Sequence, residues 1–475
     1  MKPTLEQEEI LLSENDFIYV LARAGTGKTT TLAEYTRIRK KSTFLYIVYN
    51  AAIREEAISK FPSYVRIETI HSLAYSSIGK NYKEKLTFNL KVEDLFLNSP
   101  FFKDLDINVE EDYKKGFNII QIITGFCNSS KKSFDEIEHI PHYIEIAKDY
   151  WKRMVDLKDN SVCITHDGYL KLYHLTNPKV DYEFILVDEA QDSNEVMLDI
   201  VYSQKAKKIF VGDEHQRIYS FRGAINVFDE NNYFDANSDY VQLSLTESFR
   251  FGQGIADIAN KLLSHYKKEE NLLMGTDMDS FIGMLDKTEQ YTSICRTNSL
   301  LFDLAVKHVK EGRTIHIVGG SDFIFNQIRD VYHLYIGEKD KIISEYLRTF
   351  KNYKSFKGMA TSLKVPEYMF LVKVIDKYGD NLEDYFSLIR RGLTGIRKAN
   401  VVLTTAHKSK GLEFLSVKLE DDFVNLYDDN GILIPSERID EEEINILYVA
   451  LTRATDELEL NRDLDRFINW VYYHP

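Results

Sequence analysis

The chain has 475 residues, 44% hydrophobic and 28% charged, a composition typical of a soluble globular protein with several cores. Acidic residues outnumber basic ones by 74 to 60, and the net charge of −14 argues against a surface covered in positive charge, although a narrow basic channel stays compatible with it. The sequence has no apolar run of membrane-spanning length, no secretion signal and no disulfide or metal-type cysteine spacing, so we expect a cytoplasmic protein without membrane contact.

The first informative segment lies near the start of the chain. Phe17–Leu21 is an apolar run of strand length, the loop Ala22–Gly27 follows, and Lys28 opens a run of helix-forming residues. A strand, a glycine-containing loop and a helix form the context of a phosphate-binding loop, in which Lys28 reaches the outer phosphates and the Thr29 hydroxyl holds Mg²⁺. Ala22 replaces the first glycine of the usual pattern, a position that chiefly needs a small residue. The residues expected at this nucleotide site are Ala22, Gly25, Thr26, Gly27, Lys28, Thr29 and Thr30.

A carboxylate pair follows a second apolar run. Phe184–Val187 has the pattern of a buried strand, and Asp188 and Glu189 stand at its carboxyl end, where ligands bind in parallel α/β sheets. Asp188 is expected to hold Mg²⁺ through water, while Glu189 orients and deprotonates the attacking water. Two acids after a strand can also be a polar exit or a helix cap. Together with the phosphate loop they predict a nucleoside triphosphatase.

Three segments carry a family resemblance. The sequences DEAQD at 188–192, VGDEHQRIYSFRGA at 211–224 and LYVALTRA at 447–454 resemble superfamily 1 helicases of the UvrD/Rep type. The resemblance covers most of the chain, with the motifs in the expected order. Alanine is common in that family at the position of Ala22, whereas Thr30 stands where several relatives place an arginine near the base.

Two segments are more specific. THDGYLKLYHL at 165–175 and HKSKGLEF at 407–414 are most similar to the F-box DNA helicase branch of this family. The chain begins at the segment LEQEEIL, which is similar to the family's adenine-reading Q motif. We therefore expect the F-box itself, and the ubiquitin-ligase role that it implies, to be absent.

The resemblance implies roles for residues around the nucleotide. Gln7 would read adenine, the Phe249 ring would stack on it, and Glu413 would contact the ribose. Arg250 would touch the γ-phosphate, and Gln216 would link that phosphate to the DNA contacts. The cofactors implied are ATP and Mg²⁺.

The resemblance also implies a DNA-binding surface. Sequence-tolerant movement along a strand needs aromatic stacking platforms beside backbone contacts. Phe221 stands where relatives often carry tryptophan, although a single aromatic residue can equally belong to a core, and His71 can equally be a hydrogen-bonded core histidine. The expected nucleic-acid contacts are Tyr49, Asn50, Thr69, His71, Tyr219, Phe221, Arg222, Thr405 and His407.

The last informative segment lies at Glu441–Leu458. Ile444, Leu447, Tyr448 and Leu451 recur at helical spacing and predict one apolar stripe. On that helix Arg453 lies almost opposite Ile444, away from the buried face, where a solvated arginine is the simple interpretation. The resemblance instead implies an arginine finger that reaches from one domain into the nucleotide site of the other.

The spacing of the motifs predicts an α/β fold with two recA-like, parallel-sheet P-loop domains, each interrupted by a mainly helical insertion. We expect domain 1A at 1–80 and 165–249, insertion 1B at 81–164, domain 2A at 250–337 and 399–475, and a reduced insertion 2B at 338–398. The resemblance implies an ATP-dependent translocase or helicase on single-stranded DNA or single-/double-strand junctions, moving 3′ to 5′ in repair, recombination or phage defence. The alternative is a DNA-stimulated ATPase that acts as a sensor or switch for a partner enzyme, such as a nuclease or a protein of repair or defence.

Overall fold

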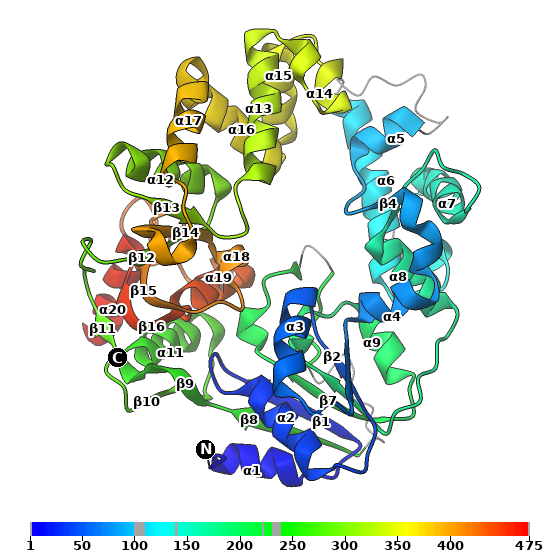
Figure 1. Ribbon diagram of the computed structural model, residues 1–475, viewed down its shortest axis with the longest axis vertical. Coiled ribbons are helices and arrows are strands. Elements are labelled where there is room, and N and C mark those ends of the chain that lie inside the picture. Colours follow the sequence, from blue (N-terminus) through cyan, green and yellow to red (C-terminus); the bar gives the residue numbers. More distant parts are fainter. Residues whose placement is uncertain (1, 99–109, 138–140, 221–222, 230–238, 474–475) are drawn as a thin grey trace. The chain divides into compact units, whose positions relative to one another are not determined.

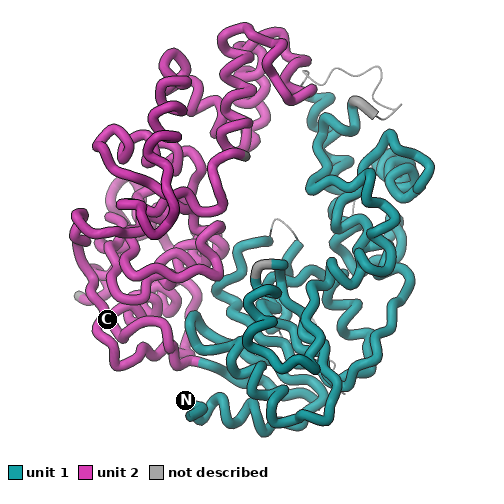
Figure 2. The backbone as a smooth tube through the Cα atoms, viewed as in Figure 1, with its two compact units in different colours: residues 1–245 teal, residues 246–475 magenta. Residues whose placement is uncertain are grey.

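The computed structural model describes residues 2–98, 110–137, 141–220, 223–229 and 239–473 (Figure 1). These residues form two compact units, one within residues 1–245 and one within 246–475 (Figure 2). Each unit is built around its own parallel sheet of six strands. The prediction of an α/β fold with two parallel sheets is therefore confirmed.

The sheet of the first unit has the strand order β3-β2-β6-β7-β1-β8, and every neighbouring pair is parallel. In β2 and β6 every residue is buried, as expected for central strands of a parallel sheet that is covered on both faces. Strand β1 lies between β7 and β8, with Phe17 in register with Lys208 and Tyr240. The strands are β1 Phe17–Ala22, β2 Phe44–Ile47, β3 Val65–Glu68, β6 Phe184–Val187, β7 Lys207–Gly212 and β8 Tyr240–Leu245.

Helices connect these strands, and several begin at a well-formed cap. Thr4 and Thr69 each form a capping box with the third residue of the following helix, which satisfies backbone N–H groups at the helix start. The helices that belong to this part of the unit are α1 Leu5–Leu12, α2 Lys28–Ile38, α3 Ala51–Lys60, α4 Ile70–Ser77, α8 His166–Leu175 and α9 Glu195–Tyr202.

The stretch between α4 and α8 is mainly helical. It contains α5 Val92–Asn98, α6 Glu110–Asn128 and α7 Pro141–Val155, with the short parallel pair β4 Leu86–Thr87 and β5 Ile164–Thr165 at its two ends. Trp151 on α7 packs edge-on against Phe126 on α6, with the ring centroids 5.4 Å apart.

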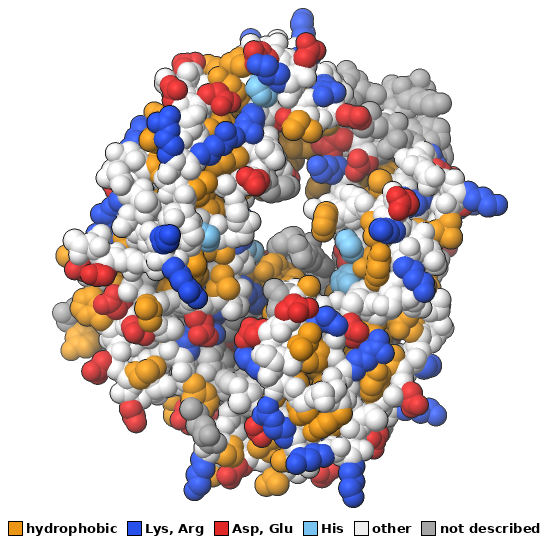
Figure 3. Space-filling model, viewed as in Figure 1, with side chains coloured by type: hydrophobic (Ala, Val, Ile, Leu, Met, Phe, Trp, Pro, Cys, Tyr) orange, Lys and Arg blue, Asp and Glu red, His pale blue; other side chains and the backbone are white. Residues whose placement is uncertain are grey.

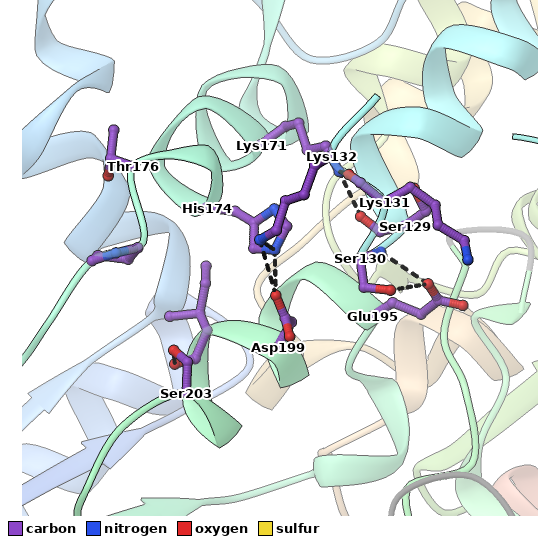
Figure 4. A network of polar contacts seen from close by, with 12 residues as sticks. Ser129, Ser130, Lys131, Lys132, Lys171, His174, Thr176, Glu195, Asp199 and Ser203 are labelled. Carbon is purple, nitrogen blue, oxygen red and sulfur yellow. Dashed lines mark hydrogen bonds and ion pairs between the residues drawn. The ribbon is translucent and has the colours of Figure 1, made fainter. Parts of the chain in front are cut away.

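A network of polar contacts, here called the anchor network, ties the end of α6 to α8 and α9 (Figure 4). The buried Lys171 donates from Nζ to the carbonyl oxygens of Ser129 and Lys131, at 2.7 and 2.5 Å. Ser130 donates from both N and Oγ to Glu195 Oε2 at 2.9 and 3.0 Å. His174 Nε2 lies 2.6 Å from Asp199 Oδ2. The loop after α6 is therefore fixed by side chains of the two helices that flank the DEAQD segment.

The sheet of the second unit has the order β11-β16-β15-β12-β14-β13, again with all pairs parallel. Strand β14 is buried at every residue and pairs with β12 and β13. The strands are β11 Phe281–Ile282, β12 Tyr291–Cys295, β13 Ile315–Ile317, β14 Val401–Thr405, β15 Phe414–Leu419 and β16 Ala454–Glu459; β9 Glu247–Gly252 and β10 Met274–Thr276 form a separate parallel pair.

The helices of the second unit surround this sheet and fill the stretch between β13 and β14 (Figure 1). Trp470 on α20 packs edge-on against His265 on α11, with the ring centroids 5.7 Å apart. The helices are α11 Gln253–Lys267, α12 Asn298–Lys310, α13 Asp322–Ile336, α14 Glu345–Thr349, α15 Tyr353–Leu363, α16 Pro366–Tyr378, α17 Leu382–Gly392, α18 Ala406–Ser409, α19 Glu441–Leu451 and α20 Arg462–Tyr473. Among the described residues of the whole chain, none of the helices is both long and apolar enough to cross a lipid bilayer.

The predicted helix over Glu441–Leu458 is wrong beyond Leu451. Helix α19 ends there, Thr452 caps it, and Ala454–Glu459 forms strand β16. Every residue from Ile444 to Leu451 is buried, so the helix has no solvated side opposite Ile444 over that stretch. Arg453 lies after the helix and is only 1% exposed, which excludes the interpretation as a solvated arginine.

Candidate functional site

The predicted phosphate loop lies between the end of β1 and the start of α2. Gly25 and Gly27 have φ values of 77° and 76°, a backbone region that favours glycine. Gly27 precedes α2 without a side-chain cap, so backbone N–H groups of the first turn stay available to an anion. Ala22 is fully buried at the end of β1, which agrees with the expected need for a small residue.

The predicted metal-binding pair meets at the carboxyl ends of β1 and β6. Thr29 Oγ1 donates to Asp188 Oδ2 at 3.1 Å, although the two residues are 159 positions apart. A hydroxyl and a carboxylate side by side are the donor set that a P-loop site offers to Mg²⁺. The residues present therefore fit a magnesium–nucleotide complex.

The Asp188 side chain is buried. Burial raises the pKa of Asp188, and the neighbouring Glu189 carboxylate raises it further. Tyr46 on β2 also donates its hydroxyl to Asp188 Oδ2. Sequence reasoning missed Tyr46, because a tyrosine within the apolar run FLYI looks like any other core residue.

The predicted base, Glu189, stands beside the phosphate loop. Its Oε1 lies 4.0 Å from Lys28 Nζ, and its Oε2 accepts a hydrogen bond from Gln191 Nε2 at 2.5 Å. Gln191 Oε1 in turn accepts the backbone N–H of Asp213 at 3.1 Å. A Cβ at Gly212 would lie 2.1 Å from that oxygen, so a larger residue there would displace the Gln191 side chain. Gln191 was noted in the sequence only as part of DEAQD, without a role.

Gln216 is buried close to this pair. Its Nε2 donates to Asp213 Oδ2 at 2.8 Å, and Asp213 also lies 3.8 Å from the guanidinium of the buried Arg23. Gln191, Asp213 and Gln216 thus connect the carboxylate of Glu189 to the segment that begins at Val211. Arg23 is a second residue that the sequence pattern did not single out.

Gln7 on α1 and Thr30 on α2 both belong to the first unit. Gln7 Oε1 accepts the backbone N–H of Thr4 at 3.1 Å, so this side chain takes part in the capping box of α1. Thr30 is exposed on the first turn of α2. Contacts of either residue with the nucleotide stay predictions.

The second unit brings together a separate set of predicted residues. Arg250 on β9 donates from Nε to Glu413 Oε1 at 2.8 Å and from Nη1 to the carbonyl of Thr452 at 3.0 Å. Arg453 donates to the carbonyl oxygens of Val449 and Leu412, at 2.9 and 3.3 Å. Phe249 is half-buried beside Arg250. Two arginines and one glutamate from distant parts of the sequence are therefore neighbours within this unit.

Two of the predicted nucleic-acid residues stack on each other, and three others are helix caps. The Tyr49 and Tyr219 rings stack with centroids 5.5 Å apart and planes 14° apart. Asn50, Thr69 and Thr405 are helix N-caps, and their side-chain oxygens accept backbone N–H groups.

The remaining predicted contacts are two histidines and two motif residues. His71 Nε2 lies 3.1 Å from Asp167 Oδ1, and His407 is half-buried on α18. Phe221 and Arg222 lie outside the described residues.

Comparison with known proteins agrees with these motifs. Residues 4–240 match the family described as the UvrD/REP helicase N-terminal domain. The chain is 32% identical to F-box DNA helicase 1 of Gallus gallus over 514 aligned residues, which cover 98% of this chain and 50% of that protein. It is also 32% identical to F-box DNA helicase protein 1 of Schizosaccharomyces pombe, over 96% of this chain and 57% of that protein.

A weaker match is a Clostridioides difficile protein named as one subunit of an ATP-dependent helicase/nuclease, which is 26% identical over 53% of this chain and 22% of that protein. The chain spans about half the length of the two F-box relatives. The resemblance is thus confirmed, to F-box DNA helicases along nearly the whole chain and to the UvrD/REP helicase domain over residues 4–240, and the chain belongs to the UvrD/REP helicase family.

Proposed function

We propose that this chain is an ATP-dependent motor on single-stranded DNA that moves 3′ to 5′ and separates duplex strands. The observation that carries the proposal is the convergence of Lys28, Thr29, Asp188 and Glu189 at one edge of the first sheet. Membership of the UvrD/REP helicase family and the names of the relatives, which include DNA helicases, support it.

The chemistry at this edge is phosphoryl transfer to water. When bound, ATP would supply the terminal phosphoryl group, and Mg²⁺ would offset part of the negative charge of the transition state. Lys28 and the N–H groups at the start of α2 would hold phosphate oxygens, while Thr29 and Asp188 would hold the metal. Glu189 accepts a proton from the attacking water, and the hydrogen bond from Gln191 keeps its carboxylate in place.

One short segment, which contains Gln216 and Tyr219, is proposed to couple hydrolysis of the γ-phosphate to DNA binding. Gln216 and Tyr219 are three residues apart, and the Tyr219 ring stacks on Tyr49 at the start of α3. A change at Gln216 on hydrolysis therefore shifts a ring that can stack on a base. Arg250, Glu413 and Arg453 are proposed to act on the nucleotide from the second unit, with Gln7 and Phe249 on adenine.

The DNA surface is proposed from the same motifs. Tyr219 and Tyr49 would stack on bases, while Asn50, Thr69, His71, Thr405 and His407 would contact phosphates or sugars. The domain boundaries stated above, with 1A and 2A as motors and 1B and 2B as insertions, belong to this proposal.

The test is turnover and strand separation with the purified chain. ATP hydrolysis is expected to rise strongly with an oligothymidylate and much less with duplex of equal length. A duplex with a 3′ single-stranded tail should be separated, and one with a 5′ tail should not. Equal hydrolysis with and without DNA would overturn the proposal, and separation of only the 5′-tailed duplex would reverse the direction.

A second candidate is a DNA-stimulated ATPase that regulates a partner enzyme without processive unwinding. The relative whose name describes part of a helicase/nuclease favours it, because that name places a motor beside a nuclease. DNA-stimulated hydrolysis without separation of either tailed duplex would favour this candidate. A repair, recombination or defence setting is proposed with either function.

A further inference from the structure

An exposed phenylalanine stands at the start of the helical stretch of the first unit. The Phe88 side chain is 85% exposed, directly after β4. Strand β4 pairs in parallel with β5, with Thr87 in register with Thr165. The next residues, Phe88 and His166, therefore leave the ladder side by side, and their ring centroids are 5.5 Å apart.

The ring of His166 contacts a buried tyrosine. Its Nδ1 lies 2.9 Å from the hydroxyl of Tyr169, a residue that is only 2% exposed. The Tyr169 ring also packs edge-on against His71 and Tyr75, at 6.3 and 5.9 Å. Figure 3 shows histidine and hydrophobic side chains together on the surface over α4 and α8. Phe88 and His166 are thus the outer end of a continuous aromatic cluster.

The cluster reaches a predicted DNA contact. His71, on the segment ETIHSLA, shares a hydrogen bond with Asp167, which directly follows His166. The segment THDGYLKLYHL, so far without a role, therefore joins the predicted DNA surface at α4 to Phe88. All of these contacts lie within the first unit.

The chemistry around Phe88 and His166, at the outer end of the cluster, suits a base and not a phosphate. Asp167 is 43% exposed and repels phosphate oxygens. Burial lowers the pKa of His166, and the neighbouring His71 lowers it further, which favours the neutral form of this ring. Uncharged aromatic rings that neighbouring side chains hold in place are the groups on which bases of single-stranded DNA stack.

We propose that Phe88, supported by His166, is a stacking platform for a base of single-stranded DNA and extends the DNA surface from α4 to the start of the helical stretch. This inference rests on the proposed function, because it needs a chain that binds single-stranded DNA. The high exposure of Phe88 allows its replacement without loss of core packing.

The test compares two fluorescently labelled strands, an oligothymidylate of about 20 nucleotides and an abasic strand of the same length. Phe88→Ala is expected to weaken binding of the oligothymidylate roughly tenfold, which corresponds to the loss of one base–ring stack. Binding of the abasic strand and the slope of affinity against salt should not change, because Phe88 carries no charge.

Three further variants separate stacking from other causes. Phe88→Trp should bind the oligothymidylate at least as tightly as the wild type, while Phe88→Leu should resemble Phe88→Ala, since leucine keeps apolar area but has no ring face. Phe117→Ala is the matched control, because Phe117 is a 44% exposed phenylalanine on α6. It should bind both strands like the wild type.

The outcomes that overturn the proposal are distinct. Wild-type affinity in Phe88→Ala, or in Phe88→Leu, excludes a stacking role while DNA-stimulated hydrolysis still supports the proposed function. An equal loss on the abasic strand means that the variant acts through the fold and not through a base. A wild-type chain that binds neither strand defeats the proposed function itself.

Discussion

Glu189 occupies the left-handed backbone region, with φ of 50° and ψ of 43°. This conformation is uncommon outside glycine and costs of order 1 kcal/mol or more. Two hydrogen bonds hold it, one from its own N–H to Asp188 Oδ1 and one from Gln191 to its carboxylate. In this conformation the carboxylate of Glu189 faces Lys28, with Oε1 4.0 Å from Nζ.

Glu189→Gln tests the role of this carboxylate. We expect ATP to bind with unchanged affinity, while hydrolysis falls roughly 10²–10⁴-fold because an amide cannot accept the proton of water. Nucleotide binding and DNA-stimulated turnover are measured on the same sample. The control is Glu9→Gln on the exposed side of α1. If the variant loses ATP affinity but keeps hydrolysis per bound ATP, the base is another residue.

Lys28→Ala tests the phosphate loop. Lys28 is only 12% exposed and lies 4.0 Å from Glu189 Oε1, so its charge is directed into the site. We expect hydrolysis to fall at least roughly 10²-fold, because a charge partner of the phosphates is removed. Lys41→Ala, an exposed lysine of the same unit, should hydrolyse ATP normally. Near-normal turnover in Lys28→Ala would contradict the nucleotide assignment.

Arg453→Ala tests a buried arginine. Its guanidinium donates to two carbonyl oxygens, which would be left without these partners, so we expect the free energy of unfolding to fall by about 2 kcal/mol or more. The matched control is Arg462→Ala, because the Arg462 side chain is 83% exposed. Urea unfolding of both variants checks this. Equal stability of the two would mean that the buried contacts of Arg453 contribute nothing.

Local patterns predicted the strand, loop and helix of the phosphate loop better than the path of the chain around Arg453. The phosphate loop is local, since a strand, a glycine loop and a helix follow one another directly. The end of α19 is not local, because Ala454–Glu459 becomes a strand through its pairing with β15. The spacing of apolar residues contains no information on that partner strand, so it predicted a helix that continues past Leu451. Tyr46 was not identified from the sequence for the same reason, because only the folded sheet places it beside Asp188.

At the scale of elements, the anchor network joins the helical stretch to the helices around the catalytic segment. Asn194, which caps α9 just after DEAQD, donates to Asn128 at the end of α6 at 2.9 Å. Lys171 lies within this network without any solvent exposure. A displacement of α6 therefore acts on the start of α9, a few residues from Glu189.

Lys171 makes this network sensitive to pH. Burial lowers the pKa of Lys171 to about 8 from an ordinary value of 10.5. Because the unfolded chain holds this proton more tightly, the contribution of Lys171 to stability is lowest below pH 8 and rises as the pH approaches 10.5. The stability of the wild type relative to Lys171→Met should therefore rise between pH 7 and pH 10, by at most about 3 kcal/mol.

Urea unfolding of both proteins at several pH values measures this difference. Groups that titrate in both proteins cancel in the comparison. Lys152→Met, which removes an exposed lysine on α7, should show no such change with pH. Parallel stability curves for the wild type and Lys171→Met would contradict the low pKa.

At the scale of the whole molecule, the predicted fold class is confirmed, whereas the strand orders could not be predicted. The apolar runs at Phe184–Val187 and Val401–Thr405 are recognisable as strands because both faces are buried. Their neighbours in the sheets come from distant parts of the chain, and spacing alone does not specify them. The family resemblance supplied the two-sheet organisation that composition and periodicity left open.

The net charge of −14 leads to a prediction about DNA binding. An acidic chain should hold single-stranded DNA by few phosphate contacts, with stacking providing the remaining affinity. We expect the logarithm of affinity to fall with the logarithm of salt concentration with a slope shallower than about −3. Titration of an oligothymidylate at several salt concentrations measures it. A slope near about −7 would indicate a heavily basic DNA path instead.

The chain's two tryptophans are divided between its two units, Trp151 beside Phe126 and Trp470 beside His265. Each unit thus contains its own intrinsic fluorophore, half-buried in an aromatic surrounding. Replacement of one tryptophan by phenylalanine leaves an emission signal from the other unit alone. Denaturation followed through each single-tryptophan protein then tells whether the two halves lose structure in one cooperative step or in two.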